Sequence, residues 1–198
     1  MDQLSVLTLD SRRRVYEYVR QNPGSHLRMI ARSLKLPLGT ALYHLDFLAS
    51  SDVLVVRRDG RYKRFFVRHM LGRREKDYVS AFRHGVPRKV VTLLLSDGGR
   101  RTQRELAREV GVSRSTLSFH VGNLVGAGIL TCEEAWPENH YGIAEPEIAT
   151  KILVMFNESL GDDADDRWSR IVETLRQGAA TVDDRAPRFA EADDAAWS

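Results

Sequence analysis

Apolar residues recur at helical spacing over residues 113–126, where Leu117, Val121 and Leu124 stand at positions i, i+4 and i+7. This spacing places the three side chains on one face of a helix and predicts that the face is buried. The hydroxyl of Ser113 is suited to accept a hydrogen bond from an unpaired backbone N–H of the first turn, so we expect Ser113 to cap this helix.

The same pattern occurs 76 residues earlier in the chain. Residues 37–54 align without a gap with residues 113–130, and residues 28–36 align with residues 104–112. Each copy therefore predicts a short helix, a tight turn and a second helix, and Gly111 is suited to end the first helix of the second copy in a left-handed conformation. The chain is a tandem duplication.

Strand patterns follow each pair of helices. Residues 53–58 and 62–68 flank Asp59-Gly60, which is a strong hairpin signal, and residues 129–134 and 141–144 flank Pro137-Glu138-Asn139. The remaining periodic segments predict further helices, over residues 10–21 with Asp10 or Ser11 as the cap, 70–85, 87–96, and two stretches beyond Pro146.

These residues carry a resemblance to a known family. The helix pattern R-x-L-A-R-x-x-G-V, followed by T-x-x-x-H-x-x-x-L and a G-I-L or D-V-L strand start, resembles the winged helix-turn-helix of ArsR/MarR-like regulators. The first copy, with its basic hairpin Gly60-Arg61-Tyr62-Lys63-Arg64, resembles the archaeal type. The resemblance covers roughly residues 10–145 and implies a mostly α fold with small β-hairpins (α+β), built of two tandem winged helix-turn-helix domains plus C-terminal helices.

We expect five segments along the chain. They are a first winged helix-turn-helix domain (1–70), a linker helix (71–85), a second winged helix-turn-helix domain (86–145), C-terminal helices for dimerisation (146–177) and an acidic disordered tail (178–198). The dimer expectation rests on Met155, Phe156, Trp168 and Leu175, which exceed the apolar surface that two small domains need to cover themselves.

Charge is distributed unevenly along the chain. Residues 1–85 hold 17 Lys/Arg against 8 Asp/Glu, whereas residues 146–198 hold 6 against 12. A basic first half is the pattern expected for a polyanionic partner. A single cysteine and the lack of an apolar run of about 20 residues favour a cytoplasmic, nucleoid-associated protein without a membrane segment.

We expect the DNA-binding residues to lie on the outward faces of the second helices and at the tip of the first hairpin. They are Gly39, Thr40, Leu42, Tyr43, Arg61, Tyr62, Lys63, Arg64, Arg114, Ser115, Thr116, Ser118 and Phe119. Arg114 is suited to donate two hydrogen bonds to guanine in a major groove. The outward face of the first copy, which includes Asp46, offers little to phosphate, so the two copies are not equivalent.

Other chemistry has weaker support. His44 and His120 border the core stripes, and we interpret them as anchors that hydrogen-bond the backbone. We interpret Cys132 as a small core residue. One cysteine and six scattered histidines give no metal-ligand spacing, and no phosphate loop or nucleophile motif is present. We therefore expect no metal, no cofactor and no enzymatic activity.

The function that the sequence favours is that of a transcriptional regulator that binds double-stranded DNA, with recognition helices in the major groove, a basic wing on the backbone, and homodimerisation through the C-terminal helices. Two alternatives remain open at this point: a winged-helix module for protein interaction or assembly, and an architectural chromatin protein that binds DNA without sequence preference.

Overall fold

The computed structural model describes residues 3–160, 173–174 and 177. Along the chain the elements are α1 (Gln3–Gln21), β1 (Ser25–His26), α2 (Leu27–Leu34), α3 (Leu38–Ser50), β2 (Leu54–Asp59), β3 (Tyr62–Val67), α4 (Arg73–Phe82), α5 (Gly85–Asp97), β4 (Arg101–Thr102), α6 (Gln103–Val110), α7 (Arg114–Gly126), β5 (Leu130–Glu133), β6 (His140–Ile143) and α8 (Pro146–Leu160). The predicted fold class, mostly α with small β-hairpins, is confirmed.

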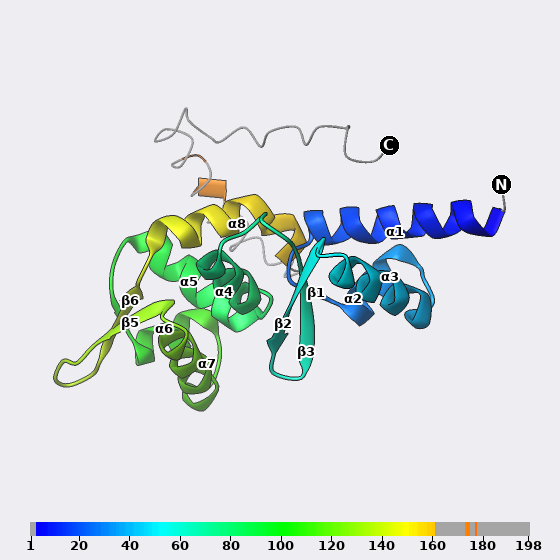
Figure 1. Cartoon of the computed structure of the whole chain (residues 1–198). Helices are drawn as coiled ribbons and strands as arrows, with labels where there is room; N and C mark the ends of the chain where they lie inside the picture. Colours follow the sequence, from blue (N-terminus) through cyan, green and yellow to red (C-terminus); the bar gives the residue numbers. More distant parts are fainter. Residues whose placement is uncertain (1–2, 161–172, 175–176, 178–198) are drawn as a thin grey trace.

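The two copies have the same topology. β1, β3 and β2 form an antiparallel sheet in that order, and β4, β6 and β5 form the matching sheet of the second copy. In each copy one helix precedes the short first strand, the helix-turn-helix pair follows that strand, and the hairpin that we call the wing comes last. Figure 1 shows α1–α3 at one end of the molecule and the β5–β6 wing at the other, with the β2–β3 wing between the two helical groups.

The turn in the second copy forms as its residues predict. Gly111 adopts φ 76° at the end of α6, and the hydroxyl of Ser113 accepts a hydrogen bond of 3.1 Å from the Thr116 N–H. In the first copy Lys35 takes the left-handed position with φ 53°, and Pro37 lies just outside α3 rather than in its first turn.

The predicted start of the first helix is wrong. We placed its cap at Asp10 or Ser11, whereas α1 begins at Gln3. Residues 3–9 contain no glycine or proline, so a residue with cap preference at position 10 does not stop a helix that can propagate through it.

Two clusters of buried side chains form the interior. The smaller one lies within the first copy and includes Val15, Ile30, Leu45 and Phe65. The larger one fills the second copy and reaches Phe66 on the first wing. Since neighbouring strand residues point to opposite sides, Phe65 and Phe66 connect β3 to two different cores.

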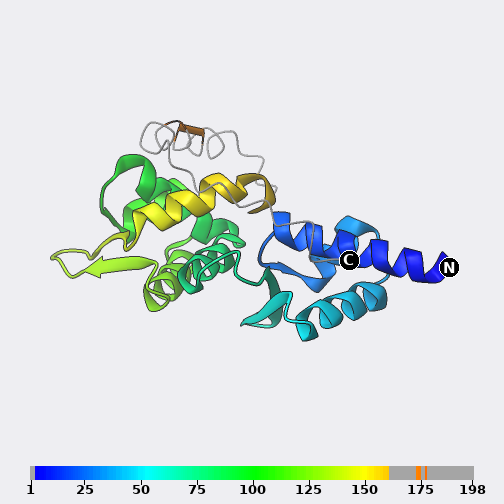
Figure 2. The ribbon, with the colours of Figure 1, turned by 45° about the horizontal axis from the view of Figure 1, so that its top comes forward.

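Helix α4, which covers most of the predicted linker helix, is part of the larger core. Its apolar face, Tyr78, Val79 and Phe82, is fully buried. The first copy approaches α4 so closely that a Cβ added to Gly24, which has φ +74°, would lie 2.9 Å from Val79 Cγ1. Helix α8 packs across α4 and α5, as Figures 1 and 2 both show.

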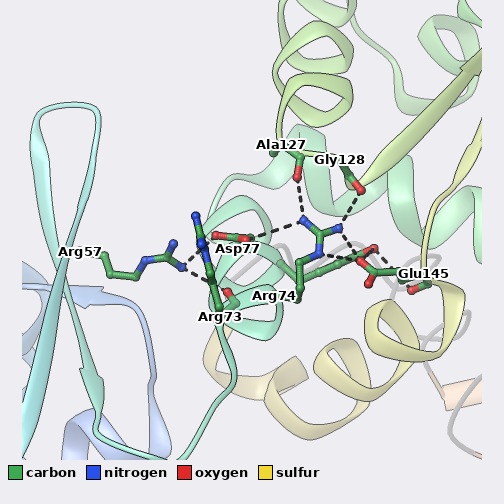
Figure 3. Close-up of polar contacts among 8 residues, drawn as sticks. Arg57, Arg73, Arg74, Asp77, Ala127, Gly128 and Glu145 are labelled. Carbon is green, nitrogen blue, oxygen red and sulfur yellow. Dashed lines mark hydrogen bonds and ion pairs between the residues drawn. The ribbon is translucent and has the colours of Figure 1, made fainter.

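Arginines join the segments around α4 (Figure 3). The guanidinium of Arg74 donates to the carbonyl oxygens of Ala127 (2.9 Å) and Gly128 (2.8 Å) at the end of α7, and to the Glu145 carboxylate before α8. Arg57 of the first wing pairs with Asp77 of α4 at 2.9 Å. These contacts attach α4 to both copies.

Arg83, just after α4, makes a further connection. It donates to the carbonyl oxygen of Pro23 in the first copy (Nε, 3.1 Å; Nη2, 2.6 Å) and to that of Ser159 in α8. Burial of this guanidinium lowers its pKa to about 10. The end of α8 is therefore held beside the first copy.

The apolar face predicted beyond Pro146 is largely turned inward. Ile152 and Phe156 are buried, Ile148 is partly buried, and Met155 is exposed. Trp168 and Leu175, and the tail from residue 178, lie outside the described residues. Among the described residues, no helix combines the length and the apolar character needed to cross a membrane.

Candidate nucleic-acid interface

Helix α7 presents a polar face to solvent. Leu117, Val121 and Leu124 are buried against the second core, so the opposite side of the helix faces outward. Arg114, Ser115, Thr116, Ser118 and Phe119 are all exposed there. The five side chains predicted for this helix therefore share one accessible surface.

The first turn of α7 is held by a network of hydroxyl groups. The Ser113 hydroxyl lies 3.0 Å from that of Ser115 and 2.8 Å from that of Thr116. From α6, Gln103 Nε2 donates to the backbone oxygen of Arg114 at 3.3 Å. The backbone that carries Arg114 is thus fixed from two sides.

The guanidinium of Arg114 contacts the second wing. Its Nη2 donates to Glu138 Oε1 at 3.3 Å, and the two groups also form an ion pair. The Arg114 side chain is 69% exposed and that of Glu138 is 32% exposed. An arginine with a single contact at one nitrogen retains donors for another acceptor.

Helix α3 presents a different surface at the equivalent positions. Leu38, Leu42, Tyr43 and Phe47 are exposed, Gly39 lies among them, and the carboxylate of Asp46 is exposed on the same side, whereas Thr40 is half-buried. Arg12 of α1 lies over the Phe47 ring, 3.6 Å from its centre. This face is apolar and acidic, in contrast to that of α7.

Arg64 must be removed from the predicted DNA-contacting residues. Only 3% of the residue is exposed, since its Nε pairs with Asp59 at 2.5 Å and its Nη1 donates to the Gly24 carbonyl oxygen at 3.0 Å. Its Nη2 lies 3.2 Å from Nε2 of His84. A phosphate cannot reach this guanidinium, which connects the first wing to the loop before α5. Because side chains alternate along a strand, Arg64 lies on the same side of β3 as Phe66. This alternation is the sequence signal that could have indicated the burial of Arg64.

The tip of the first wing retains exposed cations. Arg57 is engaged with Asp77, and Arg68 pairs with Asp52. The exposed basic residues at the tip are Arg58, Arg61 and Lys63. Arg58 and Lys63 are cross-strand neighbours, so their side chains point to the same side of the hairpin.

Tyr62 contributes an aromatic ring beside these cations. It stacks on His26 with ring centres 4.9 Å apart, and the Arg61 guanidinium lies 5.2 Å from the tyrosine ring centre. His26 in turn accepts a hydrogen bond from the Met29 N–H at the start of α2. The wing tip is thus in contact with the helix-turn-helix of its own copy.

The second wing carries features that sequence reasoning missed. Trp136 at its tip is 93% exposed. Glu133 pairs with Arg100, and Glu138 with Arg114, so two acidic groups of this wing have cationic partners. The assignment of Cys132 to the core is wrong: it is exposed, because the β5 strand beyond Leu130 faces solvent.

The predicted role of His44 is also wrong. The residue is buried, but neither ring nitrogen has a hydrogen-bond partner among the described residues. Burial and the nearby charge of Arg12 lower the pKa of this imidazole. His120 is partly exposed beside the Phe119 ring, and burial followed by the charge of His84 lowers its pKa. Over the described part of the chain, His, Cys, Asp and Glu side chains form no cluster of three or more suited to a metal ion.

Two helix-turn-helix pairs, each followed by an antiparallel wing, define a tandem winged helix-turn-helix protein. Comparison with family models agrees: residues 9–78 match a model described as an N-terminal HTH domain, and residues 87–131 match a model described as winged helix-turn-helix DNA-binding. The expected resemblance to archaeal-type tandem winged-helix regulators is confirmed.

Among individual proteins, the chain is similar to MJ1398 of Methanocaldococcus jannaschii, named as an uncharacterized HTH-type transcriptional regulator, with 24% identity over 135 residues. The match covers 68% of this chain and 33% of that protein, so the chain spans about a third of the length of this relative. Among solved structures, the DIP2311 protein from Corynebacterium diphtheriae matches 67% of this chain and 26% of its own at 17% identity, with a TM-score of 0.25. A score this low supports no structural argument.

Proposed function

We propose that the chain is a transcriptional regulator that binds double-stranded DNA. The observation that carries the proposal is the exposed face of α7, where Arg114, Ser115 and Ser118 offer donors suited to base edges and phosphates. The family model over residues 87–131 and the name of the archaeal relative support the same class of function.

The two copies contribute in different ways under this proposal. Helix α7 enters the major groove and supplies sequence preference, while Arg61 and Lys63 on the first wing contact the phosphate backbone. Phosphate contacts add affinity for every duplex, and base contacts separate one sequence from another. The apolar face of α3 adds little to either.

A protein-interaction function is the second candidate, and one observation favours it. Leu38, Leu42, Tyr43 and Phe47 are exposed on the same helix, a composition more typical of a protein interface than of a DNA-binding face. Under this alternative the first copy binds a protein while the second binds DNA. The ratio of the affinities for specific and non-specific DNA distinguishes a regulator from an architectural protein without sequence preference. A regulator needs a ratio of roughly 10³ or more.

Homodimerisation through the C-terminal helices stays a prediction with reduced support. Phe156, one of the four residues on which it rested, is buried within its own chain, and Met155 is the described member that remains exposed. Sedimentation equilibrium across a range of protein concentrations measures the oligomeric state directly.

The experiment begins with selection of bound sequences from random duplex DNA, which supplies a specific duplex and a scrambled one. In Arg61→Ala with Lys63→Ala, we expect equal losses of affinity for both duplexes and a salt slope flatter by about 2, since each phosphate contact contributes ~0.9 to the dependence of log K on log salt. In Arg114→Ala with Ser118→Ala, we expect loss of sequence preference instead.

Each pair of substitutions acts as the control for the other. If the α7 variant loses affinity equally for every duplex, α7 contacts only phosphate. If the selection yields no preferred sequence, the regulator proposal is wrong, and the architectural alternative replaces it. If the wing variant changes neither affinity nor salt slope, the first copy does not contact DNA through its wing, and the interaction alternative gains support.

A further inference from the structure

The contact between Arg114 and Glu138 joins the start of α7 to the loop between β5 and β6. We propose that Glu138 is a specificity-determining residue, which positions Arg114 for a base edge and prevents it from serving as a general phosphate contact. This inference rests on the proposed function and assigns a role to an acidic residue of the second wing.

The geometry leaves Arg114 able to bind guanine while Glu138 stays in place. A guanidinium has five N–H donors, and the hydrogen bond to Glu138, 3.3 Å from Nη2 to Oε1, uses one nitrogen. Bidentate recognition of guanine needs two donors, which the remaining edge supplies. Glu138 therefore restricts where the side chain points without using up its donors.

Glu138 is the more buried member of the pair, with its side chain 32% exposed against 69% for Arg114. The loop that carries it is bounded by the cross-strand pair Glu133 and His140. Since Gln103 also holds the backbone oxygen of Arg114, the part that remains free to move is the arginine side chain.

Charge explains why the pair favours bases over phosphates. A phosphate that approaches Arg114 brings a full negative charge close to the Glu138 carboxylate, and the two repel each other. The O6 and N7 atoms of guanine are neutral acceptors and carry no such penalty. Glu138 therefore weakens the sequence-independent part of binding more than the sequence-dependent part.

The duplication supplies an independent observation. At the positions that correspond to Arg114 and Glu138, the first copy has Leu38 and Tyr62. The copy without an arginine at the start of its second helix has no carboxylate at the equivalent position of its wing, where exposed Arg61 and Lys63 flank Tyr62. The acidic group and the arginine that it positions occur together in one copy.

The test compares Glu138→Gln with a matched control, Glu134→Gln. Both substitutions remove one negative charge from the same wing, and Glu134 is exposed and does not bond Arg114. Affinities are measured for the full chain against the selected duplex and a scrambled duplex of equal length. Thermal unfolding of each variant confirms that both remain folded.

For Glu138→Gln we expect scrambled DNA to bind about two- to fivefold more tightly, as suits an exposed ion pair, with the selected duplex changed by less. The ratio of specific to non-specific affinity therefore falls. For Glu134→Gln we expect both duplexes to shift together, so that the ratio is retained. In an Arg114→Ala background, Glu138→Gln should behave like the control.

The inference is overturned if Glu138→Gln leaves the ratio unchanged, if Glu134→Gln lowers the ratio equally, or if the effect of Glu138→Gln persists without Arg114. A wild-type chain that binds the selected and scrambled duplexes equally would overturn the proposed function and this inference together. If the wild-type chain prefers the selected duplex and Glu138→Gln leaves that preference unchanged, this inference alone is overturned.

Discussion

His44 illustrates how a single buried side chain links the fold to pH. Its imidazole sits on α3 beside the Tyr43 ring and the charge of Arg12, without a hydrogen-bond partner among the described residues. A buried ring in this setting favours the neutral form, and its pKa lies below the ordinary value of 6.5. Protonation of this residue therefore favours the unfolded chain.

We expect the free energy of unfolding to decrease as the pH falls below about 6.5, because the unfolded chain then takes up a proton that the folded His44 resists. The contribution is fully present above pH 6.5, and its slope is at most about 1.4 kcal/mol per pH unit for one proton. Urea unfolding of the wild type and of His44→Leu at pH 7.5 and pH 5.0 measures it. An unchanged pH dependence in His44→Leu would contradict the assignment.

Individual site residues show what the sequence can and cannot predict. Arg114 and Ser118 lie on the exposed face that helical spacing predicted. Arg64 was misplaced because a run of basic residues indicates charge but not which side of a strand each one occupies. The partner of Arg114 could not be predicted either, since Glu138 lies 24 residues away and reaches it only through the return of the second wing.

Among the secondary-structure elements, helix α4 determines how the two copies are joined. The spacing of Tyr78, Val79 and Phe82 predicts that the helix exists and that this face is buried. The spacing does not predict that the helix belongs to the larger core. Periodicity indicates that one face of a helix is apolar, but it does not indicate which elements pack against that face. Here the cover comes from the first wing, α5 and α8.

We expect Arg74→Met to destabilise the protein by about 1–3 kcal/mol, because it leaves the Ala127 and Gly128 carbonyl oxygens and the Glu145 carboxylate without a charged donor. The methionine retains most of the apolar stem. Arg73→Met is the control, as it removes the same charge from an exposed neighbouring position on α4. Urea unfolding measures both, and equal effects would show that net charge, rather than the Arg74 contacts, is responsible.

The larger core joins the two copies at the scale of the whole molecule. The larger core runs from Phe66 on the first wing through α4 to α8, and Arg83 connects both regions. Such continuity distinguishes this chain from two domains on a flexible tether. It also fixes the spacing between α3 and α7.

We expect calorimetry of the wild type to show one cooperative transition, with equal calorimetric and van't Hoff enthalpies. Phe66→Ala should separate this transition into two, because it removes the first-wing side chain that belongs to the shared core. Phe65→Ala is a matched control that faces the first core, and it should lower stability by a similar amount, about 3–5 kcal/mol, without separating the transition. Two transitions in the wild type would contradict coupling of the two copies through the larger core.

The contact of α8 with α4 has a consequence for the symmetry of the DNA site. Each of these helices follows a wing at the equivalent place in the duplication, and Lys151 of α8 pairs with Glu75 of α4 at 2.7 Å. One chain thus contains two winged helix-turn-helix units whose following helices pack together, an arrangement that identical subunits form by dimerisation. Identical subunits bind palindromes, whereas two fused copies with different exposed faces do not require one. Under the proposed function, the DNA site of a single chain therefore has a direction rather than palindromic symmetry.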